Sequence, residues 1–218
     1  MKKLNIAVLV SGGGTNLQAL IDNEAEENAR ATSADDGCCY KIVTVISSTK
    51  NAFALERAQK ASIPTEIASP YSVMGAEFAQ KATMQEKRIA TSDKILELCR
   101  SYKADAIVLA GYLSVLTGKI VSEYKNKIIN LHPALLPKFG GVGMWGHNVH
   151  EAVLAAHEKE SGCTVHLVDD GCDTGKILIQ KKVPVLEDDT PDSLYARIAP
   201  HEHEAIIEGV KLLAAKLK

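Results

Sequence analysis

The chain has 218 residues, a length that fits one large domain better than two small ones. Hydrophobic residues make up 46% of it, which excludes both a disordered chain and a membrane-spanning one. Aromatic residues are only 5% and the formal net charge is −2, so neither a base-stacking surface nor a general attraction to polyanions is expected. No nucleic-acid partner is predicted, and any phosphate binding must come from a local site.

The five cysteines form no C-x-x-C pair, and their odd number argues against a disulfide framework. No apolar run approaches the ~20 residues that a spanning helix needs. The apolar N-terminus runs into Ser11-Gly12-Gly13-Gly14 without a small-residue cleavage site, so it indicates a buried strand and not a signal peptide. We therefore predict a cytoplasmic protein with no membrane partner.

Apolar runs and helical spacings alternate along the chain, as in an α/β protein. Residues 4–10 form a nearly uninterrupted apolar run, typical of a strand buried on both faces. Residues 23–40 are polar, small and acidic, and are predicted to form a surface excursion. Strands are predicted at 4–10, 41–48, 63–67, 104–110, 127–131, 163–168 and 176–185. Helices are predicted at 16–22, 51–62 (with Phe53, Leu55, Ala58 and Ala61 inward), 78–103, 149–157 and 191–217, with a further helix starting within 111–116.

Strands and helices alternate throughout the first 130 residues, which predicts parallel strands joined by right-handed crossovers. The last two strands are separated only by the turn at 170–175, so an antiparallel edge is expected there. We therefore predict a single doubly wound α/β domain over residues 1–218, with a mostly parallel central sheet and an antiparallel edge toward the C-terminus.

A glycine-rich segment, residues 11–16, separates the first strand from the first helix. Its glycines let backbone N–H groups approach an anion, and Thr15 or Asn16 can cap the helix and donate to phosphate oxygens. A tight turn without a ligand explains these residues equally well. The segment lacks the Gly-Lys-Ser/Thr ending of a Walker loop, and Leu17 stands where a dinucleotide fingerprint needs its third glycine. A single monophosphate is the better fit.

Asn130 lies at the end of the predicted strand 127–131, and His132 follows that strand directly. Being two apart, they project from the same face in extended geometry. Asp173 follows about 40 residues later in the segment 169–175. Such an Asn-x-His pair is more often a turn residue beside a packed histidine. Together, however, the three suit acyl transfer: the amide would hold an oxyanion, the imidazole would move protons, and Asp173 would fix the imidazole's tautomer and favour its charged form.

A metal site can be imagined from His132, His147, His150 and Asp173, but the glycine-rich loop beside them is a poor rigid platform. The chain contains neither H-E-x-x-H nor a cysteine-based set, so no metal is predicted. His166 alternates with apolar residues on its strand and is interpreted as a core histidine.

Four segments carry a resemblance to a known family: VLVSGGGTNLQALI, DAIVLAGYLSVL, INLHPALLPKFGG and GCTVHLVDDGCDTGKILIQKKVPV. With them the chain resembles the phosphoribosylglycinamide formyltransferases nearly end to end. The resemblance implies a formyltransferase-like fold with a Rossmann-type N-terminal half, residues 1–103 binding phosphate and residues 104–218 binding folate and carrying the catalytic residues. It also implies transfer of a formyl group from 10-formyltetrahydrofolate, as co-substrate, to 5′-phosphoribosylglycinamide in purine biosynthesis. Both partners are small molecules, and a monomer or homodimer is expected.

The family's functional residues are carried over to matching positions of this chain. The resemblance implies catalysis by Asn130, His132 and Asp173, substrate binding by Gly14, Thr15, Asn16, Glu202 and His150, and folate binding by Arg88, Leu113, Ser114, Val115, Leu116, Asn130, Asp169 and Asp170. Ser114 stands where the family has an arginine, and Ala134 where its HPSLLP pattern has a serine. The segments 23–40 and 139–147 are longer than the family's, and no residue is carried over onto the second.

The expected mechanism is direct attack of the amine on the formyl carbon, with Asn130 and a charged His132 stabilising the tetrahedral intermediate. Three alternatives remain. A methionyl-tRNA formyltransferase carries an additional C-terminal nucleic-acid-binding domain and a formyltetrahydrofolate hydrolase an N-terminal regulatory domain, and the chain indicates neither. The third alternative is a non-catalytic nucleotide-binding module, which would bind phosphate without folate-dependent turnover.

Overall fold

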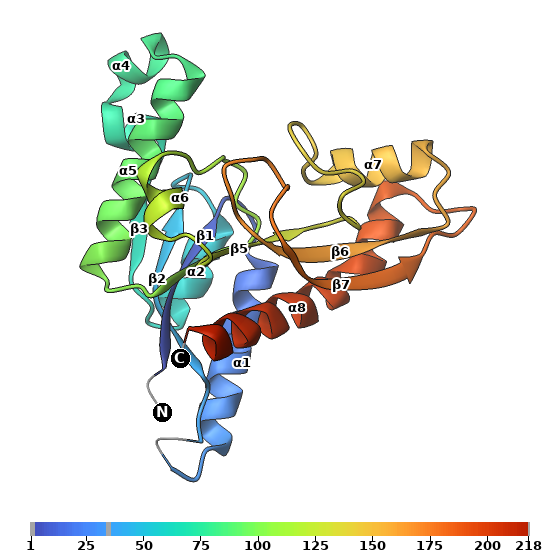
Figure 1. The fold of residues 1–218 in the computed structure, drawn as a ribbon, viewed down its shortest axis with the longest axis horizontal. Coiled ribbons are helices and arrows are strands. Elements are labelled where there is room, and N and C mark those ends of the chain that lie inside the picture. The colour runs from blue at the N-terminus through green and yellow to red at the C-terminus, as the bar shows by residue number, and fades with distance from the viewer. Residues whose placement is uncertain (1–2, 34–35, 218) are drawn as a thin grey trace.

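Seven strands form one sheet in the order β3-β2-β1-β4-β5-β6-β7 (Figure 1). In this computed structural model, which describes residues 3–33 and 36–217, β1 to β5 run parallel. β6 is antiparallel to β5 and β7, so the predicted fold class is confirmed. The strands are β1 (Leu4–Val10), β2 (Tyr40–Ser47), β3 (Thr65–Ile67), β4 (Ala106–Leu109), β5 (Ile128–His132), β6 (Glu160–Leu167) and β7 (Ile177–Pro184).

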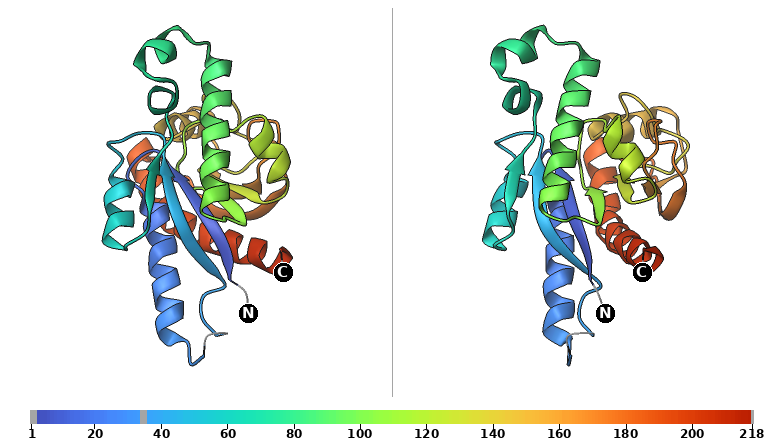
Figure 2. Two further views of the ribbon diagram at one scale, coloured as in Figure 1. Left: turned by 90° about the vertical axis from the view of Figure 1, so that its left-hand side faces the viewer. Right: turned by 60° about the vertical axis from the view of Figure 1, so that its left-hand side comes forward.

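Helices cover both faces of the sheet because successive side chains of a buried strand point to opposite sides. On β1, Ile6 and Val8 pack with α1, α2 and α8, while Ala7 and Leu9 pack with α5 and α6. The right-hand view of Figure 2 shows α2 and α5 on opposite sides of the strands. The helices are α1 (Thr15–Arg30), α2 (Phe53–Lys60), α3 (Pro70–Met74), α4 (Ala76–Lys81), α5 (Met84–Ser101), α6 (Lys119–Glu123), α7 (His147–Ala155) and α8 (Pro191–Lys216). Among the described residues, no helix is both long and apolar enough to cross a membrane.

The strand order reverses direction at β1. The chain builds β1, β2 and β3 outward on one side and then returns to add β4 and β5 on the other. In such sheets a crevice opens beyond the carboxyl ends of the strands at the reversal, and ligands bind there. The topology therefore predicts a ligand-binding site at the carboxyl ends of β1, β4 and β5.

The first helix and its connection differ from the prediction of a short helix and a surface excursion over 23–40. α1 continues to Arg30, although its apolar pattern stops near Ile21. The second half of α1 has no fully buried side chain and is held by polar contacts. The N–H of Ile42 on β2 donates to Glu24 at 3.0 Å, and Arg30 pairs with Glu26 on the helix surface at 3.1 Å. Apolar periodicity marks only the buried part of a helix, which is why the prediction ended too early.

The predicted helix 78–103 is two helices. Thr83 is the N-cap of α5 and forms a capping box with Glu86, which starts a new helix after α4 has ended. α3 was not predicted, and the predicted start of a helix within 111–116 was wrong, because α6 begins at Lys119. Phe53 and Ala61 were predicted to face inward, but both are exposed, Phe53 at 45%. The Phe53 ring lies at the helix surface, 5.0 Å from the guanidinium of Arg57.

Candidate active site

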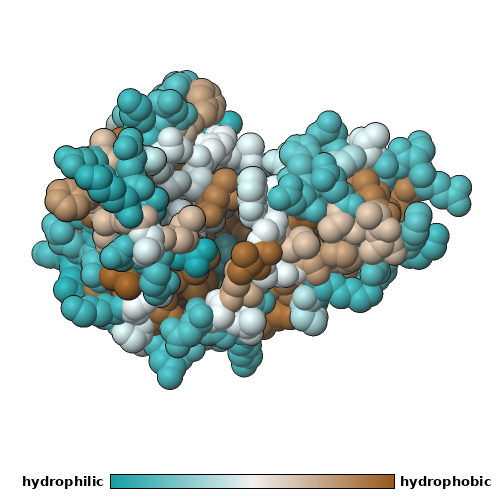
Figure 3. Space-filling model, turned by 90° about the horizontal axis from the view of Figure 1, so that it is seen from above, coloured by the Kyte–Doolittle hydropathy of each residue, from teal (hydrophilic) through white to brown (hydrophobic). Residues whose placement is uncertain are grey.

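A cavity of about 710 Å³ lies at the carboxyl ends of the central strands. Figure 3 looks onto this edge of the molecule and shows the surface hollowed between its two lobes. The cavity wall comes from segments that are far apart in the sequence, namely the loop after β1, the segment after β4, the end of β5, the loop before α7, the β6–β7 turn and α8. The predicted site residues that line it are Gly14, Thr15, Asn16, Arg88, Leu113, Ser114, Val115, Leu116, Asn130, His132, His150, Asp173 and Glu202.

The glycine-rich segment reaches α1 through Gly14, whose φ of 74° is left-handed. A Cβ on Gly14 would lie 2.6 Å from the Cβ of Ala54 at the start of α2, so this position requires glycine on two counts. Gly14 is also the N-cap of α1, and no side chain caps the helix, so the prediction that Thr15 or Asn16 would do so was wrong. The first N–H groups of α1 are thereby left without a side-chain acceptor at the rim of the cavity, an arrangement suited to an anion.

Glu202 joins α8 to this segment. The side chain is 5% exposed, and the Nδ2 of Asn16 donates to its Oε2 at 3.2 Å. Burial raises the pKa of Glu202, and the hydrogen bond from Asn16 lowers it by a smaller amount. Residues 186 positions apart in the sequence thus meet in the wall of the cavity.

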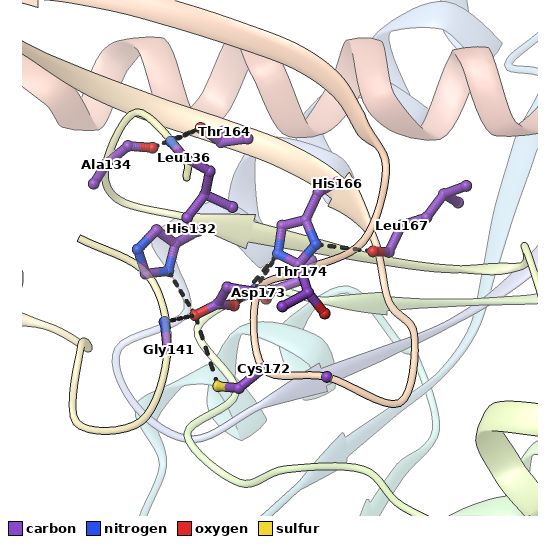
Figure 4. A network of polar contacts seen from close by, with 12 residues as sticks. His132, Ala134, Leu136, Gly141, Thr164, His166, Leu167, Cys172, Asp173 and Thr174 are labelled. Atoms are coloured by element: carbon purple, nitrogen blue, oxygen red, sulfur yellow. Dashed lines mark hydrogen bonds and ion pairs between the residues drawn. The ribbon is translucent and has the colours of Figure 1, made fainter. Parts of the chain in front are cut away.

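Asn130, His132 and Asp173 all line the cavity and lie close to one another. Figure 4 shows His132 beside Asp173. The amide Nδ2 of Asn130 lies 3.4 Å from Asp173 Oδ1, and the Nδ1 of His132 lies 3.6 Å from Asp173 Oδ2. The backbone N–H of Gly141 donates to the same Oδ2 at 3.0 Å, which fixes the carboxylate against the loop before α7. The spatial grouping on which the predicted chemistry depends is therefore present.

His132 is buried, at 3% exposure, and its Nε2 lies 2.7 Å from the carbonyl oxygen of Phe139. A carbonyl only accepts, so Nε2 carries the hydrogen, and Nδ1 faces Asp173. Burial lowers the pKa of His132 and outweighs the opposing effect of the Asp173 carboxylate. The expectation that Asp173 keeps His132 charged in the free protein is therefore corrected. Burial alone would raise the pKa of Asp173. The contact with the His166 ring, the hydrogen bond from the Gly141 N–H and the nearby imidazoles together outweigh burial and lower this pKa.

His166 is a site residue that the sequence analysis took for a core histidine. It is buried at 2% exposure, but its Nε2 lies 3.4 Å from Asp173 Oδ1 and 3.1 Å from Asn130 Nδ2. Figure 4 shows Asp173 between the rings of His132 and His166. The position of His166 follows from the antiparallel register of β5 and β6, which pairs it directly with Asn130. Only a correct strand pairing could have revealed this contact from the sequence.

The segment after β4 and Arg88 of α5 also line the cavity. The backbone N–H of Leu113 donates to the hydroxyl of Ser11 at 2.9 Å, which joins this segment to the glycine-rich segment. Asp169 and Asp170 do not line the cavity. The Oδ1 of Asp169 instead accepts from the N–H of Gly171 and the hydroxyl of Thr174, at 3.0 and 2.6 Å, and so stabilises the turn that carries Asp173.

His150 lies near the mouth of the cavity on α7. It is 2% exposed, its ring is 5.8 Å from that of Tyr195, and its Nδ1 has no hydrogen-bond partner among the described residues. Burial, with smaller contributions from His147 and His132, lowers the pKa of His150 to about 4. The described part of the chain contains no group of three or more side chains placed to hold a metal ion.

Comparison with known proteins matches residues 4–210 to the formyl transferase family. A solved glycinamide ribonucleotide transformylase from Symbiobacterium toebii is 33% identical with a TM-score of 0.82, over 98% of this chain and 89% of that one. The phosphoribosylglycinamide formyltransferase from Brucella melitensis is 36% identical with a TM-score of 0.78, over 98% and 97% of the two chains. The trifunctional purine biosynthetic protein of Drosophila melanogaster is 40% identical over 97% of this chain, which spans 14% of that protein's length.

The chain therefore belongs to the formyl transferase family. The solved relatives that it matches over most of both chains are phosphoribosylglycinamide formyltransferases, and it groups with these enzymes within the family.

Proposed function

We propose that this chain transfers the formyl group of 10-formyltetrahydrofolate to the amine of 5′-phosphoribosylglycinamide, a step of purine biosynthesis. The observation that carries the proposal is the grouping of Asn130, His132 and Asp173 in a cavity that also reaches the glycine-rich segment at the start of α1. We place the reaction in the cytoplasm, in keeping with five free cysteines, and take the working form to be a monomer or homodimer.

The cavity offers separate surfaces for the two substrates. The uncapped N-terminus of α1, with Gly14, Thr15 and Asn16, would bind the 5′-phosphate, and Glu202 beside Asn16 would contact the ribose. The folate would lie against Arg88 and residues 113–116 on the other side. Because Ser114 has no cationic side chain, backbone groups of this segment would supply the contacts there, and Arg88 would be the cation on this wall.

The chemistry begins with attack of the substrate's amine on the formyl carbon, which places negative charge on the former carbonyl oxygen. An amide N–H of Asn130 would stabilise this oxyanion, and one such donor is typically worth about 3–4 kcal/mol of barrier. His132 is uncharged before reaction, so it can accept the proton that the attacking nitrogen must lose. The imidazolium would form between the carbonyl of Phe139 and the carboxylate of Asp173, and its proton would pass to the departing folate nitrogen.

The test follows tetrahydrofolate release from 10-formyltetrahydrofolate in the presence of 5′-phosphoribosylglycinamide. His132→Ala should lower kcat by about 10²–10⁴-fold, the usual contribution of a general acid–base, while binding of the phosphorylated substrate persists. His157→Asn is the matched control, because His157 is exposed at the end of α7 with a φ of 52° that Asn tolerates. Near-normal turnover by His132→Ala would end the assignment of His132.

The same assay separates the alternatives. A hydrolase would release formate and tetrahydrofolate without the amine substrate, and a non-catalytic module would bind phosphate without releasing either product. Strict dependence of tetrahydrofolate release on the amine supports formyl transfer.

A further inference from the structure

The polar contacts of His166 constrain the side chain of Asn130. His166 and Asn130 are directly paired residues of the antiparallel strands β6 and β5, so their side chains meet on the cavity side of the sheet. His166 is 2% exposed, and its ring is held by three contacts, to Leu167, Asn130 and Asp173. The inference below rests on the proposed role of Asn130 as an oxyanion donor.

The hydrogen on one ring nitrogen of His166 is assigned by its partner. Nδ1 lies 2.9 Å from the carbonyl oxygen of Leu167, which can only accept, so Nδ1 carries a hydrogen. In a neutral ring Nε2 is then an acceptor. It faces Nδ2 of Asn130 at 3.1 Å and the carboxylate oxygen Oδ1 of Asp173 at 3.4 Å.

With a neutral His166, the Asn130 amide has no donor left over. Its Nδ2 carries two hydrogens, and the two acceptors within reach are His166 Nε2 at 3.1 Å and Asp173 Oδ1 at 3.4 Å. The amide atom that remains for a ligand is Oδ1, which accepts hydrogen bonds and repels an oxyanion. This orientation keeps the protein's polar atoms satisfied but does not suit the proposed reaction.

A hydrogen on Nε2 reverses the requirement. The charged ring donates from both nitrogens, so the Asn130 carboxamide must turn by half a rotation and offer Oδ1 to Nε2. Nδ2 is then released toward the reacting oxygen. The groups that face this ring are Asp173, whose carboxylate accepts from Nε2–H and balances its charge, and His132, which is uncharged in the free protein.

We propose that His166 is a positioning residue: a hydrogen on its Nε2 turns the Asn130 carboxamide so that the amide donors face the transferred formyl group. His166 itself does not touch the substrate. His166 also contacts Asp173, but its effect on the reaction passes mainly through Asn130, and this distinguishes it from a residue that only maintains the fold.

The first test is a double-mutant cycle measured as kcat at saturating substrates. His166→Phe should lower kcat by about 10²-fold, the usual loss for one oxyanion donor, with each KM within about threefold of the parent. In an Asn130→Ala background the same substitution should change kcat by less than about threefold, since the residue through which it acts is gone. His166→Gln, whose amide can donate to Asn130 Oδ1, should recover part of the loss.

The matched control is Val165→Ala on the same strand. Val165 is fully buried and packs on the opposite face of the sheet, away from Asn130. A general disturbance of β6 would lower kcat by the same factor in the parent and in Asn130→Ala. If His166→Phe behaves in that way, its role is structural and the proposal is wrong.

The second test does not depend on turnover. Imidazole ¹⁵N resonances of His166 are recorded in the ligand-free protein and in the unreactive complex with tetrahydrofolate and 5′-phosphoribosylglycinamide. The proposal expects a protonated Nε2 in the complex together with a shift of the Asn130 side-chain amide resonances, and an unprotonated Nε2 in the complex overturns it. If the parent transfers no formyl group, the proposed function fails, while these resonances still decide whether His166 controls the amide.

Discussion

At the scale of single residues, the state of His132 is decided by two opposing effects. Removing the imidazole from water disfavours its charged form, while the carboxylate of Asp173, 3.6 Å away, favours it. Burial is the larger effect and lowers the pKa of His132, although Asp173 is itself held ionised by a lowered pKa. His132 therefore enters the proposed reaction as a base that gains a charge beside a ready counter-ion.

This state of His132 predicts the pH dependence of turnover. The uncharged imidazole is the active form, so kcat/KM should fall on the acid side with a midpoint below 6.5, the ordinary value for histidine. Measuring kcat/KM between about pH 5 and 8 checks this, because kcat/KM reports the pKa values of the free enzyme. Above that midpoint the titration of His132 no longer changes the activity. A pH dependence that comes from the substrate's own amine is recognised because it persists in His132→Gln.

The fall in activity that the parent shows on the acid side because of His132 should be absent from the residual activity of His132→Gln. Activity that instead falls as pH rises through a midpoint above 6.5 would mean that Asp173 outweighs burial and that His132 acts as a charged oxyanion donor. The expectation drawn from the sequence would then be the correct one.

At the scale of elements, the sequence predicted the strands better than the helices. Strands buried on both faces, such as β1 and β4, are continuous apolar runs, and all seven strands of the sheet were located to within a few residues. Helix ends were less accurate, because α1 continues past the core and α4 ends where the Thr83 capping box starts α5. Asn130 and His132 could be grouped by their spacing on one strand, whereas His166 required the register of β5 with β6, which no local pattern contains.

The start of α1 gives a prediction at this scale. In Gly14→Ala the new Cβ would meet Ala54, and a residue with a Cβ would be forced into a left-handed backbone. The free energy of unfolding should fall by about 1–3 kcal/mol, as for overpacked or strained sites, and binding of the phosphorylated substrate should weaken with it. Urea denaturation and calorimetric titration measure the two effects.

Gly13→Ala is the matched control one position earlier. A Cβ on Gly13 would have no atom within 4 Å, and the φ of Gly13 is not left-handed. The free energy of unfolding of this variant should therefore fall by less than about 1 kcal/mol. Equal losses in the two variants would show that the contact of α1 with α2 does not determine the shape of the segment.

At the scale of the whole molecule, the cavity exists because the sheet joins two kinds of strand pairing. The reversal of strand order at β1 opens the crevice, and the antiparallel pair β6–β7 returns the turn carrying Asp173 to the end of β5. α8 then crosses beneath and brings Glu202 to Asn16. This assembly buries several titratable groups. Because of them, the free energy of unfolding of the whole domain depends on pH.

Two buried histidines and one half-buried histidine should make that stability fall in acid. His132, His150 and His203 all have lowered pKa values, chiefly because burial disfavours their charged forms, and that of His150 is about 4. Below 6.5 the unfolded chain binds more protons than the folded protein, so their contribution is present above 6.5 and is lost progressively as pH falls. Glu202 has a raised pKa, so its contribution to the free energy of unfolding is present at low pH. That contribution is lost as pH rises above about 4.5, the ordinary value of a glutamate, which is opposite to the effect of the histidines.

His150→Phe isolates the largest of these contributions. One pKa unit corresponds to about 1.4 kcal/mol. Between about pH 7 and pH 4 the free energy of unfolding should therefore fall on the order of 2–3 kcal/mol less in this variant than in the parent. Urea denaturation at several pH values gives the two slopes, and the exposed His157→Asn serves as the control that should keep the parent's slope. If His150→Phe keeps that slope as well, His150 takes up its proton without unfolding the protein, and its imidazole must then reach water or a counter-ion through the nearby mouth of the cavity.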